Sequence, residues 1–303
     1  MPIMEAHMPS NATSPVQRPI RSMLFVPADS ERKLEKSSNL QADALVFDLE
    51  DSVLPARKPV ARDMLKAFLP TYAGSGQPWV RVNDLESGEL LNDLAAIVPL
   101  APAGIVLPKI RGPEDLDLVG HWLDMAECMA GIEQGSTRII AVATETPEAV
   151  LRMADLIKAR RPRLLGLIWG AEDLSSAIGA DDPRTATGAW RQTYEYARIQ
   201  ALLAAHALGI QAIDTVYVDF RNPQGCEANC RDASYDGFTG KVAIHPSQVE
   251  IINTAFSPSA EQIEYARRVV AAFEQGEGAV SLDGKMLDIP HLKSARKVLS
   301  HLS

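Results

Sequence analysis

The sequence predicts an α/β fold of the (β/α)₈ barrel type, followed by a C-terminal extension. Three observations support this: short apolar runs recur along the chain, helical segments separate them, and no long Pro/Gly linker divides the series. Continuous apolar runs of this length are typical of strands buried on both faces. The expected strands are Met23–Pro27, Ala44–Leu49, Trp79–Asn83, Gly104–Lys109, Arg138–Thr144, Leu164–Trp169, Ala212–Asp219 and Lys241–His245.

Helical signals occupy the segments between the runs. Asp29-Ser30 is a good N-cap pair, Pro113 suits a first helical position, and Gly209 suits a helix end. The segment Gln224–Ser234 reads instead as a loop containing Cys226 and Cys230. The expected helices are Glu31–Leu40, Val60–Phe68, Glu114–Met129, Pro147–Ala159 and Gly188–Leu208.

The pattern divides the chain into three parts. Residues 1–17 read as a disordered arm, residues 18–257 as the barrel, and residues 258–303 as a helical extension or lid that contributes to a neighbouring subunit. Within the extension, Pro258–Gln275 is an amphipathic helix, and Val280–Ser303 holds a short strand, the turn Asp283-Gly284 and a basic helix. We expect this tail to lack a core of its own, so it must pack on the barrel or reach a neighbour.

Composition narrows the class of protein. The formal net charge of −9 argues against a nucleic-acid partner. No apolar run approaches the ~18 residues of a membrane span, and Met1–Arg18 has no apolar signal region. We therefore expect a cytoplasmic protein without a membrane partner. Three cysteines do not form a disulfide framework, and Cys226 and Cys230 lack the further ligands of a structural zinc site.

Charged residues follow several of the expected strands at the point where each strand ends. Because the chemistry of parallel barrels lies at the C-terminal ends of the strands, these side chains should converge on one rim. A mixture of carboxylates, one arginine and one lysine suits an oxygen-ligated divalent cation and an anionic substrate. The residues are Asp48, Glu50, Asp51, Arg81, Lys109, Glu145 and Asp173.

Glu145 and Asp173 are the best candidates for metal ligands. Mg²⁺ is held by few carboxylates and keeps open positions for water and substrate oxygens. The alternative for both residues is helix capping, because Glu145 precedes Thr146-Pro147 and Asp173 precedes Leu174. Glu172 is the neighbour most easily confused with Asp173.

Arg81 lies in an apolar strand, where an unpaired charge is costly. It therefore pairs with Asp48, Glu50 or Asp51 of the adjacent strand, faces substrate, or does both. The three acids either hold metal-bound waters, orient Arg81 or cap a helix. A Schiff base at Lys109 is disfavoured, because nearby acids stabilise the charged amine.

For two further residues, position alone gives less evidence of a functional role. His245 ends the last expected strand, where a hydrogen-bonded structural role and a role as a base are both open. Asp283 belongs to an Asp-Gly pair, which is an ordinary turn.

Several motifs together resemble the citrate lyase beta-subunit-like family of the aldolase/citrate lyase superfamily, which includes malyl-CoA and citramalyl-CoA lyases. The resemblance runs from about Arg18 to Ser303. The motifs are Arg21-Ser22-Met23-Leu24-Phe25-Val26-Pro27, Asp48-Leu49-Glu50-Asp51-Ser52-Val53, Arg81-Val82-Asn83, Leu107-Pro108-Lys109, Glu145-Thr146-Pro147 and Gly237-Phe238-Thr239-Gly240-Lys241-Val242-Ala243-Ile244-His245-Pro246.

The resemblance implies a barrel that forms homotrimers or homohexamers, with Mg²⁺ held by Glu145 and Asp173. It implies that Arg81 contacts substrate, and we expect Lys109 and Arg21 to bind substrate as well. Asp283-Gly284-Lys285-Met286 matches a C-terminal motif whose acid enters the active site of a neighbouring subunit. Asp283 thereby becomes an expected catalytic acid/base.

The function implied is Mg²⁺-dependent carbon–carbon cleavage or formation of a 3-hydroxyacyl-CoA thioester, such as malyl-CoA or citramalyl-CoA. The partners are a CoA thioester and a 2-oxo acid, glyoxylate or pyruvate. Three alternatives stay open: a citrate lyase beta subunit acting on an acyl-carrier-protein thioester in a complex, a malate-synthase-like acyltransferase with thioester hydrolysis, and a catalytically silent binding protein.

Overall fold

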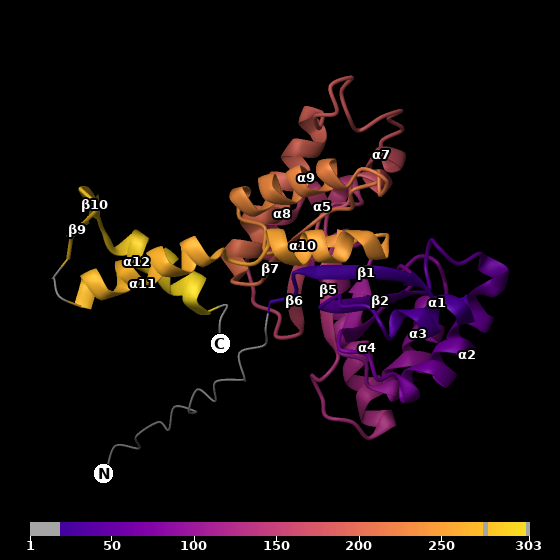
Figure 1. Ribbon diagram of the computed structural model, residues 1–303. Helices are drawn as coiled ribbons and strands as arrows, with labels where there is room; N and C mark the ends of the chain where they lie inside the picture. The colour runs from indigo at the N-terminus through magenta and orange to yellow at the C-terminus, as the bar shows by residue number, and fades with distance from the viewer. Residues whose placement is uncertain (1–18, 275–277, 301–303) are drawn as a thin grey trace, which may run out of the picture. The chain divides into compact units, whose positions relative to one another are not determined.

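Eight parallel strands close into a barrel in chain order in the computed structural model, which describes residues 19–274 and 278–300 (Figure 1). The barrel closes where β1 pairs with β8 as well as with β2. The predicted (β/α)₈ barrel is therefore confirmed. The strands are β1 (Ser22–Pro27), β2 (Ala44–Asp48), β3 (Gln77–Arg81), β4 (Gly104–Leu107), β5 (Arg138–Val142), β6 (Leu164–Ile168), β7 (Gln211–Asp214) and β8 (Gly240–Ala243).

Side chains of each strand alternate between two apolar layers. Met23, Val46 and Val106 belong to a cluster drawn from most of the strands, which fills the barrel interior. Leu24 and Leu45, one position along, belong to the larger cluster between the strands and the helices. Both faces of the strands are buried, which explains why the strands are continuous apolar runs in the sequence.

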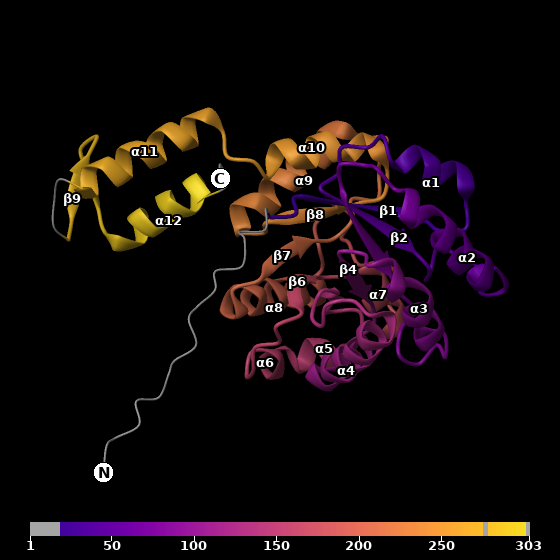
Figure 2. The same cartoon turned by 90° about the horizontal axis from the view of Figure 1, so that it is seen from below.

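Helices surround the strands in both views of the barrel (Figures 1 and 2). None of the helices in the described ranges has the length and apolar content to cross a bilayer. The helices are α1 (Glu31–Ser37), α2 (Lys58–Phe68), α3 (Leu90–Ile97), α4 (Pro113–Ala130), α5 (Pro147–Leu151), α6 (Met153–Leu156), α7 (Glu172–Ala177), α8 (Gln192–Leu208), α9 (Pro223–Asp236) and α10 (Val249–Ala255).

Two predicted helices have different bounds in the structure. The segment predicted as one helix over Pro147–Ala159 is broken at Arg152, whose backbone leaves the helical region, so α5 and α6 are separate. The helix predicted from Gly188 begins at Gln192 instead. Gly188 has φ of +83°, a left-handed conformation that a right-handed helix cannot include.

The prediction of a loop over Gln224–Ser234 is wrong, because this segment lies inside helix α9. Asn222 caps the helix by accepting a hydrogen bond from the Gly225 amide, with Pro at the first helical position. Cys226 and Cys230 lie one turn apart and are buried in the layer between helices and strands. Their burial gives them a packing role.

The C-terminal segment forms a second compact unit. It contains α11 (Ala260–Glu274), an antiparallel hairpin of β9 (Val280–Leu282) and β10 (Lys285–Leu287), and α12 (Ile289–Ser300). The expectation that this tail lacks a core is wrong, because α11 supplies the apolar face that the tail needs. The buried residues of the small core are Ala266, Val269, Leu287 and Ala295. The predicted arm over residues 1–17 lies outside the described residues.

A buried ion pair joins the last two strands of the barrel, β7 and β8. Lys241 Nζ lies 2.5 Å from Asp214 Oδ2 and donates to the Thr215 carbonyl at 2.6 Å, and its side chain is fully buried. Trp169 Nε1 donates to the other Asp214 oxygen at 2.6 Å. Each charge is therefore matched by hydrogen bonds, as a charge in the protein interior requires.

We predict that Asp214→Ala destabilises the protein by about 3–5 kcal/mol, because it leaves the Lys241 ammonium buried without a partner. Urea unfolding measures the change. The control is Arg231→Ala, which removes the exposed pair with Glu227 at 2.6 Å and should cost only about 0.3–0.5 kcal/mol. Equal losses in the two variants would contradict a special role for the buried pair.

Candidate functional site

Arg81 and Asp48 form a two-armed ion pair at the C-terminal ends of β3 and β2. The two residues are register partners in the sheet, so their side chains leave adjacent strands at the same level. Arg81 Nε and Nη2 donate to the two oxygens of Asp48, each at 2.7 Å. The Phe25 ring covers the guanidinium at 4.8 Å. The expectation that Arg81 pairs with the acids of the neighbouring strand is confirmed.

Asp48 is committed to holding this arrangement. It also accepts hydrogen bonds from the Glu50 and Ser52 amides at 3.0 and 3.2 Å. Burial raises its pKa, but the hydrogen bonds and charge of Arg81 outweigh burial, so the pKa lies below its usual value. A carboxylate in this state orients Arg81 and is a poor proton acceptor.

The carboxylate of Glu50 is less well satisfied by hydrogen bonds than that of Asp48. Its Oε1 lies 2.5 Å from Lys109 Nζ and its Oε2 lies 2.8 Å from Arg81 Nη1, yet Oε2 has no aligned hydrogen bond. Arg81 therefore offers charge to Glu50 without a well-directed donor. Burial dominates and raises the pKa of Glu50 to about 7, against the opposing charges of Arg81 and Lys109.

Lys109 connects the two halves of the acidic rim. Its backbone has φ of +52°, which is left-handed and unusual for a residue with a Cβ. In this conformation its amide donates to Glu145 Oε2 at 2.7 Å. Its ammonium lies 3.2 Å from Asp51 and 3.4 Å from Asp173. Strain of this kind persists only where surrounding contacts enforce it, and it is concentrated at functional sites.

Glu145 and Asp173 lie close enough for their charges to interact. Glu145 follows β5 and is 5% exposed, whereas Asp173, in the first turn of α7, is partly exposed. A Cβ on Gly170 would come within 3.0 Å of Glu145 Cγ, so a glycine leaves room for this carboxylate. Burial, with the charges of Asp173 and Glu50, raises the pKa of Glu145 well above its usual value.

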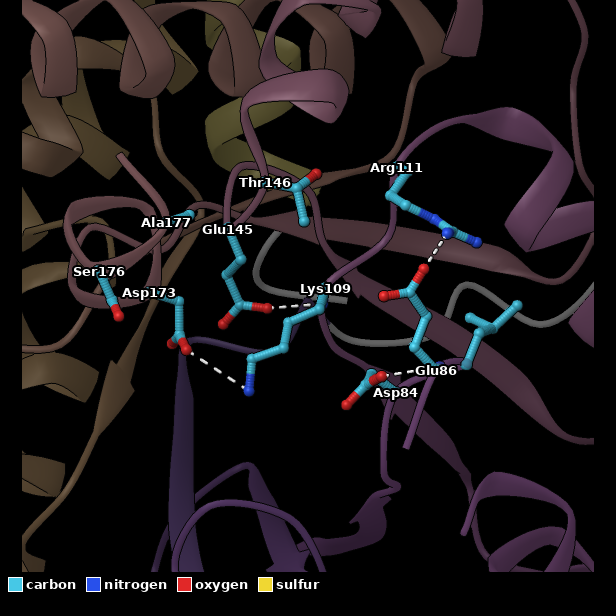
Figure 3. A pocket seen from close by; sticks show the side chains of 10 residues that line it. Asp84, Glu86, Lys109, Arg111, Glu145, Thr146, Asp173, Ser176 and Ala177 are labelled. Atoms are coloured by element: carbon cyan, nitrogen blue, oxygen red, sulfur yellow. Dashed lines mark hydrogen bonds and ion pairs between the residues drawn. The ribbon is translucent and has the colours of Figure 1, made fainter. Parts of the chain in front are cut away.

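A cavity of about 370 Å³ opens beside these acids (Figure 3). Glu145 and Asp173 point toward Lys109 in the figure, and Arg111 contacts Glu86 on the opposite side. The volume lies at the small end of the ~300–1,000 Å³ range of ligand pockets. The lining residues are Asp84, Leu85, Glu86, Lys109, Arg111, Glu145, Thr146, Asp173, Ser176 and Ala177.

A second layer of polar residues supports the rim from α2 and α3. Lys58 Nζ donates to the Leu49 and Glu50 carbonyls at 3.3 and 3.4 Å and contacts the Asn83 side chain. Asn83 in turn donates to Leu49 and to the buried carboxylate of Asp93. The sequence analysis did not identify Lys58 or Asp93, although the Arg81-Val82-Asn83 motif contained part of the signal.

The structure does not bring Arg21, predicted to bind substrate, to the acidic rim. Arg21 precedes β1 and therefore lies at the N-terminal ends of the strands, opposite the acidic rim. Its guanidinium donates to both oxygens of Asp43 and to the Ser257 hydroxyl, each at 2.8 Å. These contacts give Arg21 a structural role at that end.

Asp283 and His245 lie in different settings. Asp283 occupies the turn of the β9–β10 hairpin with φ of +52°, and its carboxylate contacts Arg268 on α11. His245 caps the turn after β8, where its ring accepts from the Ser247 amide and stacks on Phe220 at 4.8 Å. The structure supports the structural reading of His245.

The raised pKa of Glu50 predicts a pH-dependent stability in chelator-treated protein. A carboxyl whose pKa rises from 4.5 to about 7 on folding stabilises the fold fully below pH 4.5, and this contribution is lost as pH rises through 7. Glu50→Gln, which cannot ionise, should therefore show a smaller fall in the free energy of unfolding between about pH 5 and pH 8. Urea unfolding across this range, with exposed Glu35→Gln as control, measures the slope. If the free energy of unfolding of Glu50→Gln falls with pH as steeply as that of the wild type, the raised pKa of Glu50 is refuted.

Comparisons with known proteins show the family to which the chain is similar. A sequence model of the family described as HpcH/HpaI aldolase/citrate lyase matches residues 21–246. The chain is 36% identical to a (3S)-malyl-CoA thioesterase of Cereibacter sphaeroides, over 93% of this chain and 94% of that protein. It is 32% identical to the mitochondrial citramalyl-CoA lyase of Rattus norvegicus, over 93% of this chain and 86% of the relative.

A solved structure gives the same result. The CitE protein of Mycobacterium tuberculosis, in complex with magnesium, acetoacetate and coenzyme A, superposes with a TM-score of 0.76 at 32% identity. The match covers 93% of this chain and 98% of that one. The resemblance expected from the motifs is confirmed, and this protein belongs to the HpcH/HpaI aldolase/citrate lyase family.

Proposed function

We propose that this protein is an Mg²⁺-dependent carbon–carbon lyase of a 3-hydroxyacyl-CoA thioester such as malyl-CoA or citramalyl-CoA. The products would be an acetyl-CoA-type ester and glyoxylate or pyruvate, and the reaction runs in either direction. The observation that carries the proposal is one rim that combines the Arg81–Asp48 pair with Glu145 and Asp173. The names of the lyase and thioesterase relatives support the class of thioester.

The donor set of this rim fits Mg²⁺. The described residues contain no preformed group of three or more His, Cys, Asp or Glu ligands, so an all-protein cage is not the design. Mg²⁺ instead binds through one or two carboxylates and keeps open positions. Burial and the charge of Asp173 raise the pKa of Glu145, and a cation held by Glu145 and Asp173 would relieve the repulsion between them. When bound, the ion supplies a Lewis acid and a template for substrate oxygens.

Arg81 would stabilise the negative charge that develops on the thioester oxygen. Cleavage would break the bond between the hydroxyl-bearing carbon and the α-carbon and leave the electron pair on the thioester as an enolate, and protonation of the α-carbon would then give the acetyl-CoA-type ester. Asp48 fixes the guanidinium before the reaction, so no reorganisation is needed as the charge forms. Glu50 and Asp51 would complete the charge balance around Arg81 and Lys109.

Asp283, presented by the C-terminal unit of a neighbouring subunit, would accept the proton of the substrate hydroxyl. Its side chain lies half-exposed at a hairpin turn, which suits a group presented to another chain. We include in the proposal a homotrimer or homohexamer in which residues 258–303 serve as this lid, and a cytoplasmic location. Lys109 would bind the substrate carboxylate through its ammonium.

Thioester hydrolysis after condensation is the second candidate, and the malyl-CoA thioesterase relative favours it. A subunit acting on a carrier-protein thioester is the third, suggested by relatives named citrate lyase subunit beta-like protein. The three reactions share the enolate step and differ in the acyl carrier and in the fate of the thioester.

The direct test is a screen of purified protein with Mg²⁺. Acetyl- and propionyl-CoA are incubated with glyoxylate or pyruvate, and malyl- and citramalyl-CoA are tested for cleavage, with free thiol measured in parallel. We expect one combination of acyl-CoA and 2-oxo acid, together with the cleavage of its product, to give the highest rates. No turnover of any CoA ester, together with co-purification of an acyl-carrier protein, would favour the complex instead.

We predict that Glu145→Gln and Asp173→Asn each weaken Mg²⁺ binding by at least about tenfold. Loss of a supporting residue outside the ligand set already costs ~10–100-fold at metal sites, so loss of a ligand should cost no less. Calorimetric titration with Mg²⁺ measures this without substrate. Exposed Asp63→Asn is the control. Unchanged Mg²⁺ affinity in both site variants would contradict the assignment of Glu145 and Asp173 as metal ligands.

We also predict that Asp283 acts in trans. Asp283→Ala and Glu145→Gln should each be inactive alone, yet mixing them under conditions of subunit exchange should restore part of the activity. Hybrid sites would combine an intact rim from one chain with an intact Asp283 from another. Native mass spectrometry verifies the mixed oligomers. If these form without recovery, Asp283 does not act across an interface.

A further inference from the structure

The hairpin that carries Asp283 has a fixed backbone. Strands β9 and β10 pair with Lys285 opposite Leu282, so the connection between them consists of Asp283 and Gly284. These two residues have φ of +52° and +74°, and a type I′ turn of two residues requires positive φ at both positions. Aspartate tolerates this left-handed conformation better than most residues with a Cβ. The turn therefore sets the direction in which the Asp283 side chain leaves the backbone.

Apolar packing holds the hairpin within the C-terminal unit. Leu287 is buried in the small core that α11 and α12 supply, and Val280 and Leu282 pack against the same core. Met286, the neighbour of Leu287 in β10, is exposed instead. One face of the hairpin is thus anchored, and the hairpin lies beside α11 in both views of the molecule (Figures 1 and 2).

Arg268 of α11 fixes the direction of the Asp283 carboxylate. Its Nη2 donates to Asp283 Oδ1, and within residues 19–274 and 278–300 no other carboxylate lies in ion-pair distance of this guanidinium. Glu264 lies one turn earlier on α11, at the spacing of an ordinary helical ion pair, yet Arg268 reaches the turn of the hairpin. Asp283 Oδ2 accepts no hydrogen bond in these ranges, so one carboxylate oxygen is free.

The ion pair contributes little to the stability of the C-terminal unit. The side chains of Arg268 and Asp283 are 45% and 52% exposed, and water screens the attraction between charges at such positions. The hairpin is already held by its apolar core and by the geometry of its turn. The main effect of the pair is therefore on the carboxylate itself, because it determines which oxygen is engaged and which is free.

We propose that Arg268 is a positioning residue for Asp283, which holds one carboxylate oxygen and leaves the other to face the substrate hydroxyl in a neighbouring subunit. This inference rests on the proposed function, in which Asp283 accepts the proton of that hydroxyl. A general base acts only within hydrogen-bond reach of the proton it removes, and a misplacement of about 1 Å can cost ~100-fold in rate. Because Arg268 does not touch substrate in this role, its loss should lower kcat and leave KM unchanged.

Steady-state cleavage of malyl-CoA and citramalyl-CoA by the full chain with Mg²⁺ tests this role. Arg268→Gln should lower kcat by about 10- to 100-fold at unchanged KM, a smaller loss than that of Asp283→Ala. Arg268→Lys keeps a charged donor without the guanidinium fork and should restore part of kcat. Arg267→Gln removes the exposed arginine one position earlier on α11, is the matched control and should have the kcat of the wild type.

Subunit mixing tests whether Arg268 acts together with Asp283 on one C-terminal unit. Arg268→Gln mixed with Glu145→Gln should gain activity, because hybrid sites combine an intact rim with a unit in which both Arg268 and Asp283 are intact. Arg268→Gln mixed with Asp283→Ala should gain none, because every C-terminal unit then lacks one of the two residues. Native mass spectrometry verifies that both mixtures contain hybrid oligomers.

Three results would overturn the inference and leave the proposed function standing, provided that Asp283→Ala is inactive. They are a wild-type kcat in Arg268→Gln, a gain of activity in its mixture with Asp283→Ala, and a raised KM at unchanged kcat, which would place Arg268 on the substrate. A loss of kcat that urea unfolding traces to destabilisation of Arg268→Gln, or that Arg267→Gln shares, overturns it as well. Full activity in Asp283→Ala overturns the proposed role of Asp283 and the inference together.

Discussion

The rim of this barrel depends on the ion pair between Arg81 and Asp48. Asp48 is buried and the Arg81 side chain is only 14% exposed, and two hydrogen bonds between them satisfy both charges. The pair uses the Nε and Nη2 edge of Arg81, whereas Nη1 lies 2.8 Å from Glu50 Oε2 without an aligned hydrogen bond. The remaining carboxylates are left with Lys109 as their main cation, and the rim keeps an excess of negative charge.

Burial and this excess together explain the raised pKa values of two carboxyls at the rim. Glu50 and Glu145 have raised pKa values because burial removes their solvation while neighbouring carboxylates repel them. A divalent cation held by Glu145 and Asp173 would offset the repulsion between these two carboxylates. The left-handed backbone of Lys109 belongs to the same arrangement, because it aims one amide at Glu145 while the ammonium reaches across to Asp173.

Much of this could be predicted from the sequence, and the failures have physical reasons. The barrel was predictable because strands buried on both faces are continuous apolar runs, and the rim because strand ends coincide with polar residues. The motif that contains Arg21 led to the prediction of a substrate contact, although its position before the first strand indicates the N-terminal end of the barrel. The polar composition of Gln224–Ser234 concealed a helix whose cap and first proline were visible. The core of the C-terminal unit depends on contacts between separate segments, which sequence periodicity cannot reveal.

The same charges decide between two kinds of carbon–carbon chemistry open to a barrel with a lysine at its rim. An imine mechanism needs a neutral amine, which burial alone would favour. At Lys109, however, the hydrogen bond and charge of Glu50 and the charges of Asp173 and Asp51 outweigh burial and raise the pKa of the ammonium. The lysine therefore remains a cation, as the sequence suggested. The chemistry proposed for this rim would therefore stabilise an enolate by charge, a role that the fixed guanidinium of Arg81 would suit.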